Sequence, residues 1–257
     1  MNNSVLIIPV MNLALAFVPV LIVVGILYKW SLDFGNALYA VSRMLVQLLL
    51  VGYFLAYIFK SDSAWIVISV LIVMVFASSW IALRTVNDKR RMLFTKALCA
   101  ITIGGGTTLL LVTQGVVDLQ PWYWPLYMIP LAGMIFAGAM NSVSLASERL
   151  NAEMKRNVHF DEARGTALKA SLIPITNSLF AVGLVSLPGM MTGQVLSGVS
   201  PLIAARYQIM VMCMIFSAAG ISSACFLSMI KPHAKNFMVN GRQDLSSPDN
   251  HSISYGN

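Results

Sequence analysis

Seven stretches of this chain are apolar over about 20 residues each, the length that an α-helix needs to cross the hydrocarbon core of a bilayer. Lipid offers no hydrogen-bonding partners, so a chain inside it has to satisfy its own backbone groups, and a helix does this locally. The predicted spans are residues 5–28, 36–59, 64–83, 96–116, 124–147, 172–196 and 204–230. We therefore expect an all-α fold, a polytopic transmembrane helical bundle of about seven spans.

The composition supports a membrane protein. Charged residues make up 11% of the chain and hydrophobic residues 58%, whereas about 25% of a typical soluble domain is charged. We expect one transmembrane domain over residues 1–234. Residues 235–257 are polar and rich in Ser and Asn, which predicts a disordered cytoplasmic tail.

Basic residues lie in alternate connections between the predicted spans. They follow the first, third, fifth and seventh spans: Lys29; Arg84, Lys89, Arg90 and Arg91; Arg149, Lys155, Arg156, Arg164 and Lys169; Lys231, Lys235 and Arg242. The opposite connections hold only Lys60 and Arg206. Because Lys and Arg favour cytoplasmic connections, we expect the N-terminus outside and the C-terminus in the cytoplasm. The net charge of +7 thus reflects membrane orientation and not a nucleic-acid partner.

The sixth predicted span is interrupted by Leu187-Pro188-Gly189. Proline removes a backbone donor and glycine favours a turn. A break inside lipid has to be covered by protein or line a polar cavity, and in transporters an interrupted span points to the substrate path. The alternative is a kinked helix with a packing role, or a turn at the membrane surface, since kinked membrane helices are common.

The chain carries no sequence motif for catalysis or for binding ATP. The patterns GxxxxGK[ST], HExxH and GxSxG do not occur. Gly104-Gly105-Gly106 lies in a predicted span and indicates close helix packing. All ten carboxylates lie in connections, in tails or at span ends, whereas proton- or sodium-coupled carriers use ionisable groups inside the membrane. We expect no enzyme activity and no cofactor on this chain, and either passive transport or an energy source on a partner.

Arg43 and Gln47 stand out in the second predicted span. They are four residues apart and therefore share one helix face. An arginine about two turns inside an apolar span is a candidate functional residue. The alternative is that its side chain extends back to the lipid headgroups.

The fifth predicted span carries polar groups in its cytoplasmic half, namely Asn141, Ser142 and Ser144. Four methionines lie close to this motif or to the interrupted span: Met134, Met140, Met190 and Met191. Thioethers bind soft ions such as Cu(I). Methionine also fills irregular apolar gaps, and both explanations remain open.

Three groups of residues form a recognisable pattern: LVSLPGMMTG at 184–193 with RYQIM at 206–210; Arg43 and Gln47 with Val51-Gly52-Tyr53; and Ile129-Pro130 with Gly133-Met134 and Ala139-Met140. This pattern resembles the FetB-type family of ABC-transporter permeases, which the resemblance links to iron export. Plant aluminium-resistance membrane proteins belong to the same family. The resemblance covers residues 38–229. It implies a permease subunit that exports a metal ion, forms a homodimer and works with a separate cytoplasmic ATPase, which holds the ATP.

The resemblance and the polar groups together predict a substrate pathway. We expect it to be lined by Arg43, Gln47, Met134, Met140, Asn141, Asn177, Pro188, Met190 and Met191. Arg43, Gln47, Asn141 and residues 187–191 are expected to face one shared cavity. Asn177 stands where relatives often have Asp, and Ala137-Gly138 where they usually have Gly-Asn, so Asn141 is the candidate substitute for that asparagine. No metal-ligand set is assigned.

The connection at residues 148–171 is expected to meet the ATPase. Leu150, Met154 and Val158 recur at four-residue steps, which predicts an amphipathic helix. It would lie on the membrane surface or in a groove of the ATPase. Arg164-Gly165-Thr166-Ala167 resembles the turn of the family's coupling segment, in a shorter loop, and Gly165 is expected to break the helix. The predicted docking residues are Glu153, Glu162, Arg164, Gly165 and Thr166.

Three functions are compatible with these features. The first is the permease subunit of an ATP-driven exporter of iron or another metal ion, in the plasma membrane (the inner membrane of a bacterium). The second is a passive channel or facilitator, which needs no structured cytoplasmic connection. The third is a membrane scaffold without transport, which needs neither Arg43 and Gln47 nor the interrupted span.

Overall fold

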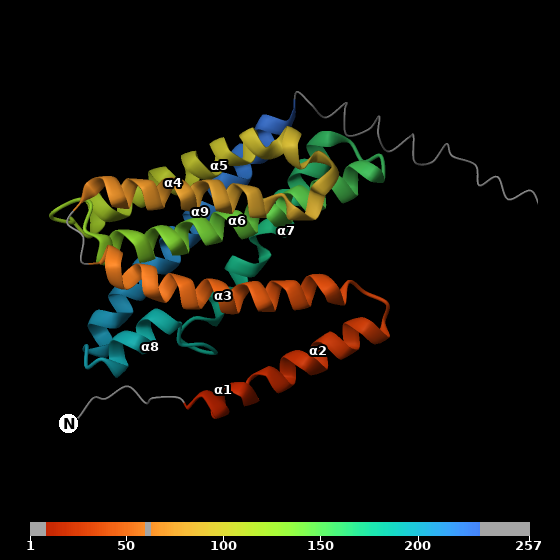
Figure 1. Ribbon diagram of the computed structural model, residues 1–257. Coiled ribbons are helices and arrows are strands. Elements are labelled where there is room, and N and C mark those ends of the chain that lie inside the picture. Colours follow the sequence, from red (N-terminus) through yellow and green to blue (C-terminus); the bar gives the residue numbers. More distant parts are fainter. Residues whose placement is uncertain (1–8, 60–62, 232–257) are drawn as a thin grey trace, which may run out of the picture.

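The computed structural model describes residues 9–59 and 63–231, which form helices joined by short connections (Figure 1). The helices are α1 (Val10–Leu15), α2 (Phe17–Lys29), α3 (Phe34–Ile58), α4 (Ala64–Ala82), η1 (Arg84–Lys89), α5 (Arg90–Leu110), η2 (Leu111–Val116), α6 (Pro125–Lys155), α7 (Phe160–Ala181), α8 (Gly189–Leu196) and α9 (Pro201–Ile230). η1 is a 3-10 helix and η2 a π-helix. The predicted all-α fold is confirmed. The predicted tail at 235–257 lies outside the described residues.

Local sequence signals set several helix ends. Asp33 precedes α3, and its Oδ1 accepts a hydrogen bond from the Asn36 backbone N–H at 3.0 Å, as an N-cap residue does. Pro125 and Pro201 occupy the first turns of α6 and α9, where the N–H that proline lacks has no helical partner anyway. At the end of α4, Arg90 donates to the carbonyl of Trp80 at 2.6 Å and stacks on its ring.

Six helical segments of the described chain are long and apolar enough to cross a membrane: Met11–Lys29, Phe34–Leu55, Ala64–Ala82, Arg84–Val116, Pro125–Lys155 and Pro201–Ile230. The remaining predicted span, residues 172–196, is divided, because α7 ends at Ala181 and α8 begins at Gly189. The interruption predicted at Pro188 is therefore present. The number of crossings and the side on which each terminus lies remain predictions.

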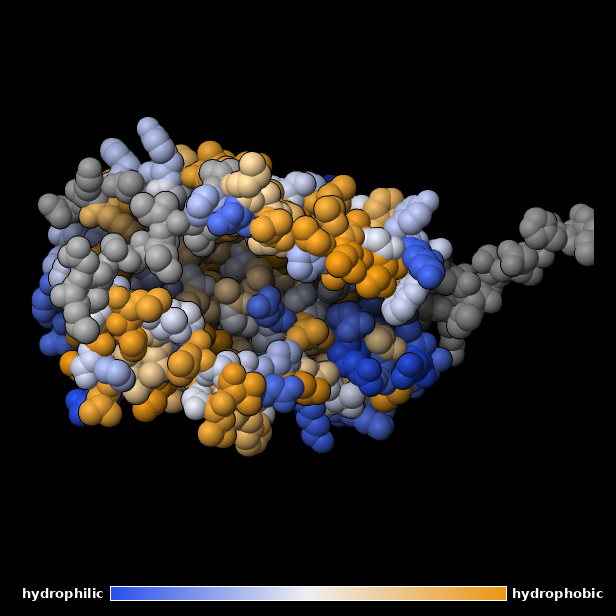
Figure 2. All heavy atoms as spheres, turned by 90° about the horizontal axis from the view of Figure 1, so that it is seen from below, coloured by the Kyte–Doolittle hydropathy of each residue, from blue (hydrophilic) through white to orange (hydrophobic). Residues whose placement is uncertain are grey.

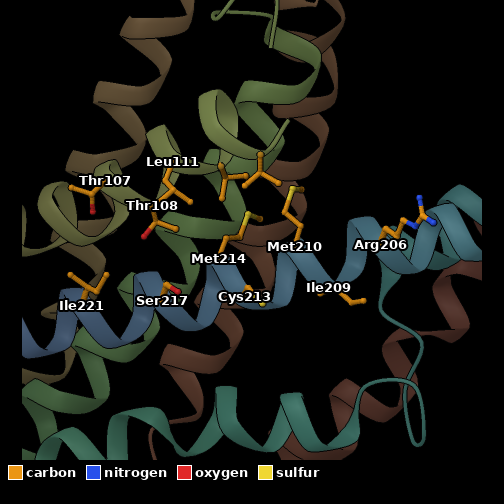
Figure 3. A pocket seen from close by; sticks show the side chains of 12 residues that line it. Thr107, Thr108, Leu111, Arg206, Ile209, Met210, Cys213, Met214, Ser217 and Ile221 are labelled. Carbon is orange, nitrogen blue, oxygen red and sulfur yellow. The ribbon is translucent and has the colours of Figure 1, made fainter. Parts of the chain in front are cut away.

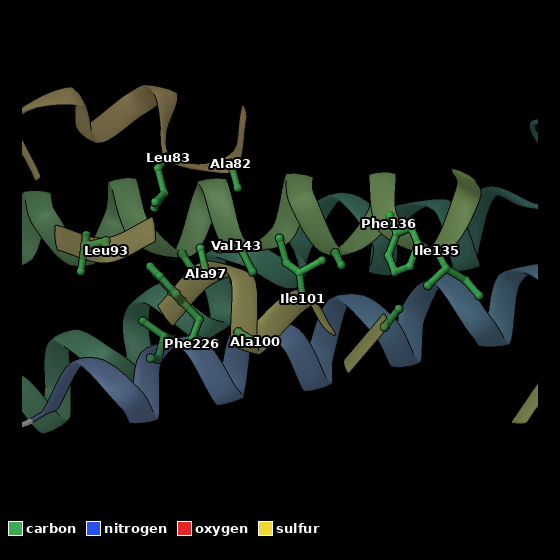
Figure 4. Packing of buried hydrophobic residues seen from close by; sticks show 14 of the residues in the cluster. Ala82, Leu83, Leu93, Ala97, Ala100, Ile101, Ile135, Phe136, Val143 and Phe226 are labelled. Atoms are coloured by element: carbon green, nitrogen blue, oxygen red, sulfur yellow. The ribbon is translucent and has the colours of Figure 1, made fainter. Parts of the chain in front are cut away.

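The hydrophobic core lies between α4, α5, α6 and α9, and α7 packs against α6 and α9. Small and large side chains alternate in it: Ala97 and Ala100 of α5 lie beside Phe226 of α9 (Figure 4). Ile101 and Ile135 are fully buried. These five elements form one bundle, which we call the core bundle.

Two glycines bring α5 unusually close to its neighbours. A Cβ on Gly104 would lie 2.3 Å from Ser222 Oγ and 2.6 Å from the Ser222 backbone nitrogen on α9. A Cβ on Gly105 would lie 2.8 Å from the Phe136 ring on α6, whereas Gly106 faces open space. The predicted close packing is confirmed for Gly104 and Gly105 and is wrong for Gly106.

The first three helices form an arm that stands apart from most of the core bundle (Figure 1). We call residues 9–59 the N-terminal arm. Its apolar side chains are largely exposed, with Leu49 at 78% and Tyr53 at 85%. One polar contact to the core bundle is a long hydrogen bond, 3.5 Å, from Arg84 Nη1 to Asn36 Oδ1. In a membrane this apolar surface has to be covered by lipid or by another protein.

The basic connections gather at one end of the molecule. Figure 2 shows hydrophilic residues concentrated there, toward the right of the view. We call it the basic end; it carries η1, the connection between α6 and α7, and Lys231. The opposite, aromatic end carries Trp122, Tyr123 and Trp124 in the connection before α6. This separation is the one that the alternating basic connections predict.

The predicted loop at 148–171 is instead a helical hairpin. α6 continues to Lys155, residues 156–159 make the turn, and α7 begins at Phe160. Leu150 and Met154 are buried in the hydrophobic core with Phe160. The apolar face that we expected on the membrane or on the ATPase is thus already covered within the chain. Gly165 lies inside α7, so the predicted break is wrong; packing of the helix outweighs the low helix propensity of one glycine.

The contact of α5 with α9 gives a first prediction. Gly104→Ala should destabilise the protein by about 1–3 kcal/mol, because the new Cβ overlaps backbone atoms of Ser222 that cannot move away alone. Gly106→Ala is the matched control, since its Cβ meets nothing within 4 Å. Thermal unfolding of the purified proteins in detergent measures both. Equal melting temperatures for the two variants would contradict the close contact.

Candidate functional site

A polar cavity of about 170 Å³ opens on the surface of the core bundle between α6, α7 and α9. Polar groups and small side chains form much of its wall. The lining residues are Gly138, Asn141, Ser142 and Leu145 of α6, Ser171, Pro174, Ile175 and Ser178 of α7, and Ile215 and Ala219 of α9. No charged side chain is among them. We take this polar cavity as the candidate functional site, since polar groups at membrane depth are costly unless they serve packing or function.

Two serine hydroxyls and one backbone carbonyl join the three helices beside the cavity. The Ser142 and Ser223 Oγ atoms lie 2.6 Å apart, and Ser142 Oγ donates to the Ser171 carbonyl at 3.3 Å. A serine hydroxyl has one hydrogen, so Ser223 donates to Ser142, which donates to α7. The Ser171 hydroxyl itself donates to the Leu168 carbonyl at 2.8 Å. Ser142, Ser171 and Ser223 are all buried, so the network ties α6, α7 and α9 together inside the protein.

Pro174 adds an irregularity to the cavity wall. It lies inside α7 and has no backbone N–H, so the carbonyl one turn earlier, of Ala170, loses its helical donor. Ser178 Oγ donates to the Pro174 carbonyl at 3.0 Å. Ser171, Pro174 and Ser178 are three and four residues apart, which places them on one face of α7. All three residues line the cavity, and Pro174 and Ser178 are also exposed.

Gly138 sets the spacing on the opposite side of the cavity. A Cβ there would lie 2.8 Å from Ile215 Cγ2, so α6 and α9 are close at this point. Asn141 lies one turn further along α6, and no hydrogen bond to its side chain is formed within the part of the chain that the structure describes. Its amide is thus available to a bound solute or to water.

The structure brings only one of the predicted pathway residues into this cavity. Asn141 lines it, whereas Asn177 is exposed on α7 beside Ser178. Pro188 is the N-cap of α8 and does not line the cavity. Three of the four methionines pack against the hydrophobic core: Met134, Met140 and Met190. The fourth, Met191, is half-buried on α8.

Arg43 and Gln47 lie elsewhere, on the exposed surface of α3. When the Gln47 amide is oriented with its oxygen toward the guanidinium, that oxygen accepts from Arg43 Nε at 3.0 Å and from Nη2 at 3.2 Å. The shared cavity that we expected for Arg43, Gln47, Asn141 and residues 187–191 is therefore not formed within one chain. The physical reason is that α3 belongs to the N-terminal arm and packs mainly on α2.

The predicted docking residues are not all exposed, so not all of them can contact an ATPase. Glu153 is buried, with 9% of its side chain exposed, and forms an ion pair with Arg149. Glu162 and Gly165 are exposed, and Arg164 and Thr166 are half-buried. Arg164 pairs with Asp161 at 3.5 Å, and Asp161 also contacts Lys231, the residue after α9, at 3.5 Å. Glu153 is thus unsuited to direct contact with a partner.

The cavity can solvate a solute but offers no strong metal site. Its polar atoms are hydroxyl, amide and carbonyl oxygens, the ligand type of hard cations. Among the described residues, no group of three or more His, Cys, Asp or Glu is placed to hold a metal ion. Uncharged oxygen ligands bind a cation weakly and release it readily, so the cavity suits a cation in transit better than a tightly bound metal.

Sequence reasoning missed Ser171, Pro174 and Ser178 as a unit. The signal that could have found them is their spacing of three and then four residues, which repeats a helix face. The face is hidden in the sequence because Ser171 ends a predicted connection, whereas Pro174 and Ser178 belong to the interrupted span.

Comparison with known proteins identifies related chains. A family model described as "Uncharacterised protein family (UPF0014)" matches residues 10–234. A UPF0014 membrane protein of Synechocystis sp. is 40% identical over 206 residues, 74% of this chain and 79% of that protein. The "Probable iron export permease protein FetB" of Escherichia coli is 35% identical over 243 residues, 86% and 90% of the two chains. "Protein ALUMINUM SENSITIVE 3" of Arabidopsis thaliana is 34% identical over 227 residues, 82% and 81%. No solved structure matches the chain.

The serine network gives a second prediction. In a double-mutant cycle, Ser142→Ala and Ser223→Ala should couple by about 0.6 kcal/mol, and at most about 1.7 kcal/mol, the range for hydrogen bonds between membrane helices. Equilibrium unfolding in bicelles measures the coupling. Ser142→Ala with Ser228→Ala is the control pair, because Ser228 is exposed and donates to its own helix. Additive behaviour of Ser142 and Ser223 would show that their hydroxyls do not interact.

Proposed function

This multi-pass membrane protein belongs to the UPF0014 family, and from this premise we propose that it is the permease subunit of an ATP-driven exporter. The exported solute is iron or another metal ion, and the energy comes from a separate cytoplasmic ATPase that holds the ATP. The protein works in the plasma membrane, the inner membrane of a bacterium. The name of the Escherichia coli relative, a probable iron export permease, supports the solute and the direction.

The observation that carries this proposal is the polar cavity between α6, α7 and α9. It lies between α7 and two helices that are long and apolar enough to cross a membrane, α6 and α9, and its lining consists of uncharged oxygen and nitrogen groups and apolar side chains. A cation passing between such groups exchanges water for hydroxyl and carbonyl oxygens without being held by a fixed negative charge. This favours transit over tight binding.

The position of the carboxylates supports an external energy source. Within the described residues they lie in connections or toward the ends of helices: Asp33, Asp88, Asp118, Glu148, Glu153, Asp161 and Glu162. Carriers driven by protons or sodium place such groups at membrane depth, beside the substrate. The polar cavity of this chain has none.

The hairpin of α6 and α7 provides a mechanical connection between an ATPase and the cavity. α6 has 31 residues and is about 46 Å long, so it extends well beyond a hydrocarbon core of about 30 Å. Its projecting end is braced by buried Leu150, Met154 and Phe160, and Asp161 contacts Lys231. A push on the hairpin therefore moves α6 and α7 as rigid bodies, and both line the polar cavity.

We assign ATPase docking to the exposed tip of this hairpin. The tip residues are Lys155, Arg156, Asn157, His159, Asp161 and Glu162. Gly165 is one turn away and also exposed. Glu153 supports the hairpin from inside through its ion pair with Arg149.

A homodimer is part of the proposal, because one chain leaves polar groups facing lipid. Arg43 and Gln47 lie on a helix whose other side chains are mainly apolar and exposed. Gln47 is one polar partner of the Arg43 guanidinium, yet a charged side chain that stays exposed at this depth is costly. A second copy of the chain covers this pair together with the apolar surface of the N-terminal arm.

Docking is tested by co-purification of the full chain with its candidate ATPase. Combining Lys155→Glu with Glu162→Lys should weaken capture about tenfold, the effect of losing somewhat more than 1 kcal/mol at an interface. Lys29→Glu is the control, since Lys29 ends α2 outside the hairpin. If the unmodified chain captures no ATPase in membranes that contain both proteins, the ATP-driven function is wrong and a passive facilitator becomes the better explanation.

The pathway is tested by filling the polar cavity. Ser178→Leu should reduce metal export at least tenfold, because the larger side chain occupies the cavity and removes the hydroxyl that donates to the Pro174 carbonyl. Ser228→Leu is the control on an exposed face of α9. Metal uptake into inverted vesicles, with the ATPase present and ATP supplied, measures export. Unchanged export by Ser178→Leu, at equal protein levels, would remove this cavity from the pathway.

A further inference from the structure

A second cavity of about 480 Å³ lies as an open groove on the surface of the core bundle, between α9 and the end of α5 with η2. Figure 3 shows Arg206 at one end of the row of lining residues and Ile221 and Thr107 toward the other. We call it the α5–α9 groove. It takes no part in the polar cavity, which lies on the side of α9 that carries Ile215 and Ala219.

The wall of the groove is almost entirely apolar. Leu111 of η2 faces Met210 and Met214 of α9 across it (Figure 3), and Val112 and Val116 of η2 also line it. The hydroxyls of Thr107 and Thr108 do not serve a ligand, because they donate to carbonyls of their own helix at 2.6 and 2.7 Å. A polar solute would therefore find few hydrogen-bonding partners along the groove, whereas a hydrocarbon chain needs none.

Arg206 is the one charged residue among those that line the groove. It is exposed, and within the described part of the chain no hydrogen bond or ion pair to its guanidinium is formed. The nearby carboxylate Asp118 follows η2 and accepts a hydrogen bond from Gln120 instead. An arginine that is unpaired at one end of an apolar groove is suited to an anionic group, and its planar guanidinium matches a phosphate.

A smaller cavity of about 220 Å³ adjoins the groove at this end. It is lined by Val116, Val117, Arg206, Tyr207 and Met210, so it shares Val116, Arg206 and Met210 with the larger groove. Together the two cavities form a long apolar channel that ends at Arg206, with the Tyr207 phenol beside it. A phospholipid fits this arrangement, with an acyl chain in the apolar part and the headgroup at Arg206.

We propose that the α5–α9 groove binds an anionic phospholipid, with an acyl chain along α9 and the phosphate on Arg206. Arg206 and Ile221 are 15 residues apart, or about 22 Å along a helix, which exceeds the roughly 15 Å of one leaflet. The groove therefore accommodates a whole acyl chain. Arg206 lies near the start of α9 at the aromatic end, so the lipid belongs to the leaflet at that end. The site does not depend on the proposed ATPase.

Lipid retention by the purified full chain tests the proposal. The protein is reconstituted in nanodiscs of three parts phosphatidylcholine to one part phosphatidylglycerol, extracted gently, and analysed by native mass spectrometry for bound lipid. We expect phosphatidylglycerol to be retained in preference to phosphatidylcholine. Arg206→Gln should reduce that preference about fivefold, since one basic residue near a membrane surface contributes about 1 kcal/mol to anionic lipid binding. Arg206→Lys should keep part of it.

Two further variants separate the parts of the site. Ser217→Trp fills the groove away from Arg206 and should reduce retention although the charge is intact. Arg91→Gln is the control, because Arg91 is exposed at the basic end and should leave retention unchanged. Equal retention of both lipids by the unmodified protein, or an unchanged preference in Arg206→Gln, would overturn the proposal. Displacement of phosphatidylglycerol by millimolar inorganic phosphate would also overturn it, because the site would then recognise phosphate without an acyl chain.

Discussion

The close contact between α5 and α9 at Gly104 and Ser222 determines much of this structure. Because Ser222 lies against the backbone of α5, the next residue, Ser223, is turned toward α6 and bonds with Ser142. The same helix then presents Ile215 and Ala219 to the polar cavity and Met210 and Met214 to the α5–α9 groove. A side chain at position 104 would displace α9 and both cavities with it.

The helices α6 and α7 form the hairpin at the basic end and line the polar cavity further along their length. α6 and α7 carry buried apolar residues near the basic end and serine hydroxyls further in. Since neither helix has a loop between these regions, force applied at the tip reaches the serine network without passing through a flexible segment. Pro174 is the exception, because it weakens the hydrogen-bond ladder of α7 at the cavity itself.

The sequence predicted those features that depend on local chemistry. The helical fold and the packing of Gly104 and Gly105 follow from hydropathy and from residue size. The predicted interruption is present, although the helix ends earlier than expected, at Ala181, and Pro188 serves as the N-cap of α8. Asn141 lines a cavity, but not one shared with Arg43, Gln47 and residues 187–191 as the sequence predicted. The face of α7 with Ser171, Pro174 and Ser178 and the separation of Arg43 from Asn141 depend on which helices pack together, and hydropathy does not encode partner choice. The burial of Leu150 and Met154 shows the same limit, since an amphipathic pattern gives an apolar face but not the element that covers it.

The N-terminal arm has a consequence for biogenesis. Its helices precede the core bundle in the chain, so the ribosome delivers them to the membrane before the helices that form the hydrophobic core have been made. They bury almost none of their surface against the helices of the core bundle. The arm therefore does not depend on packing against the core bundle while that bundle is being made. Quality control that senses exposed polar residues in membranes would meet the exposed Arg43 during this interval.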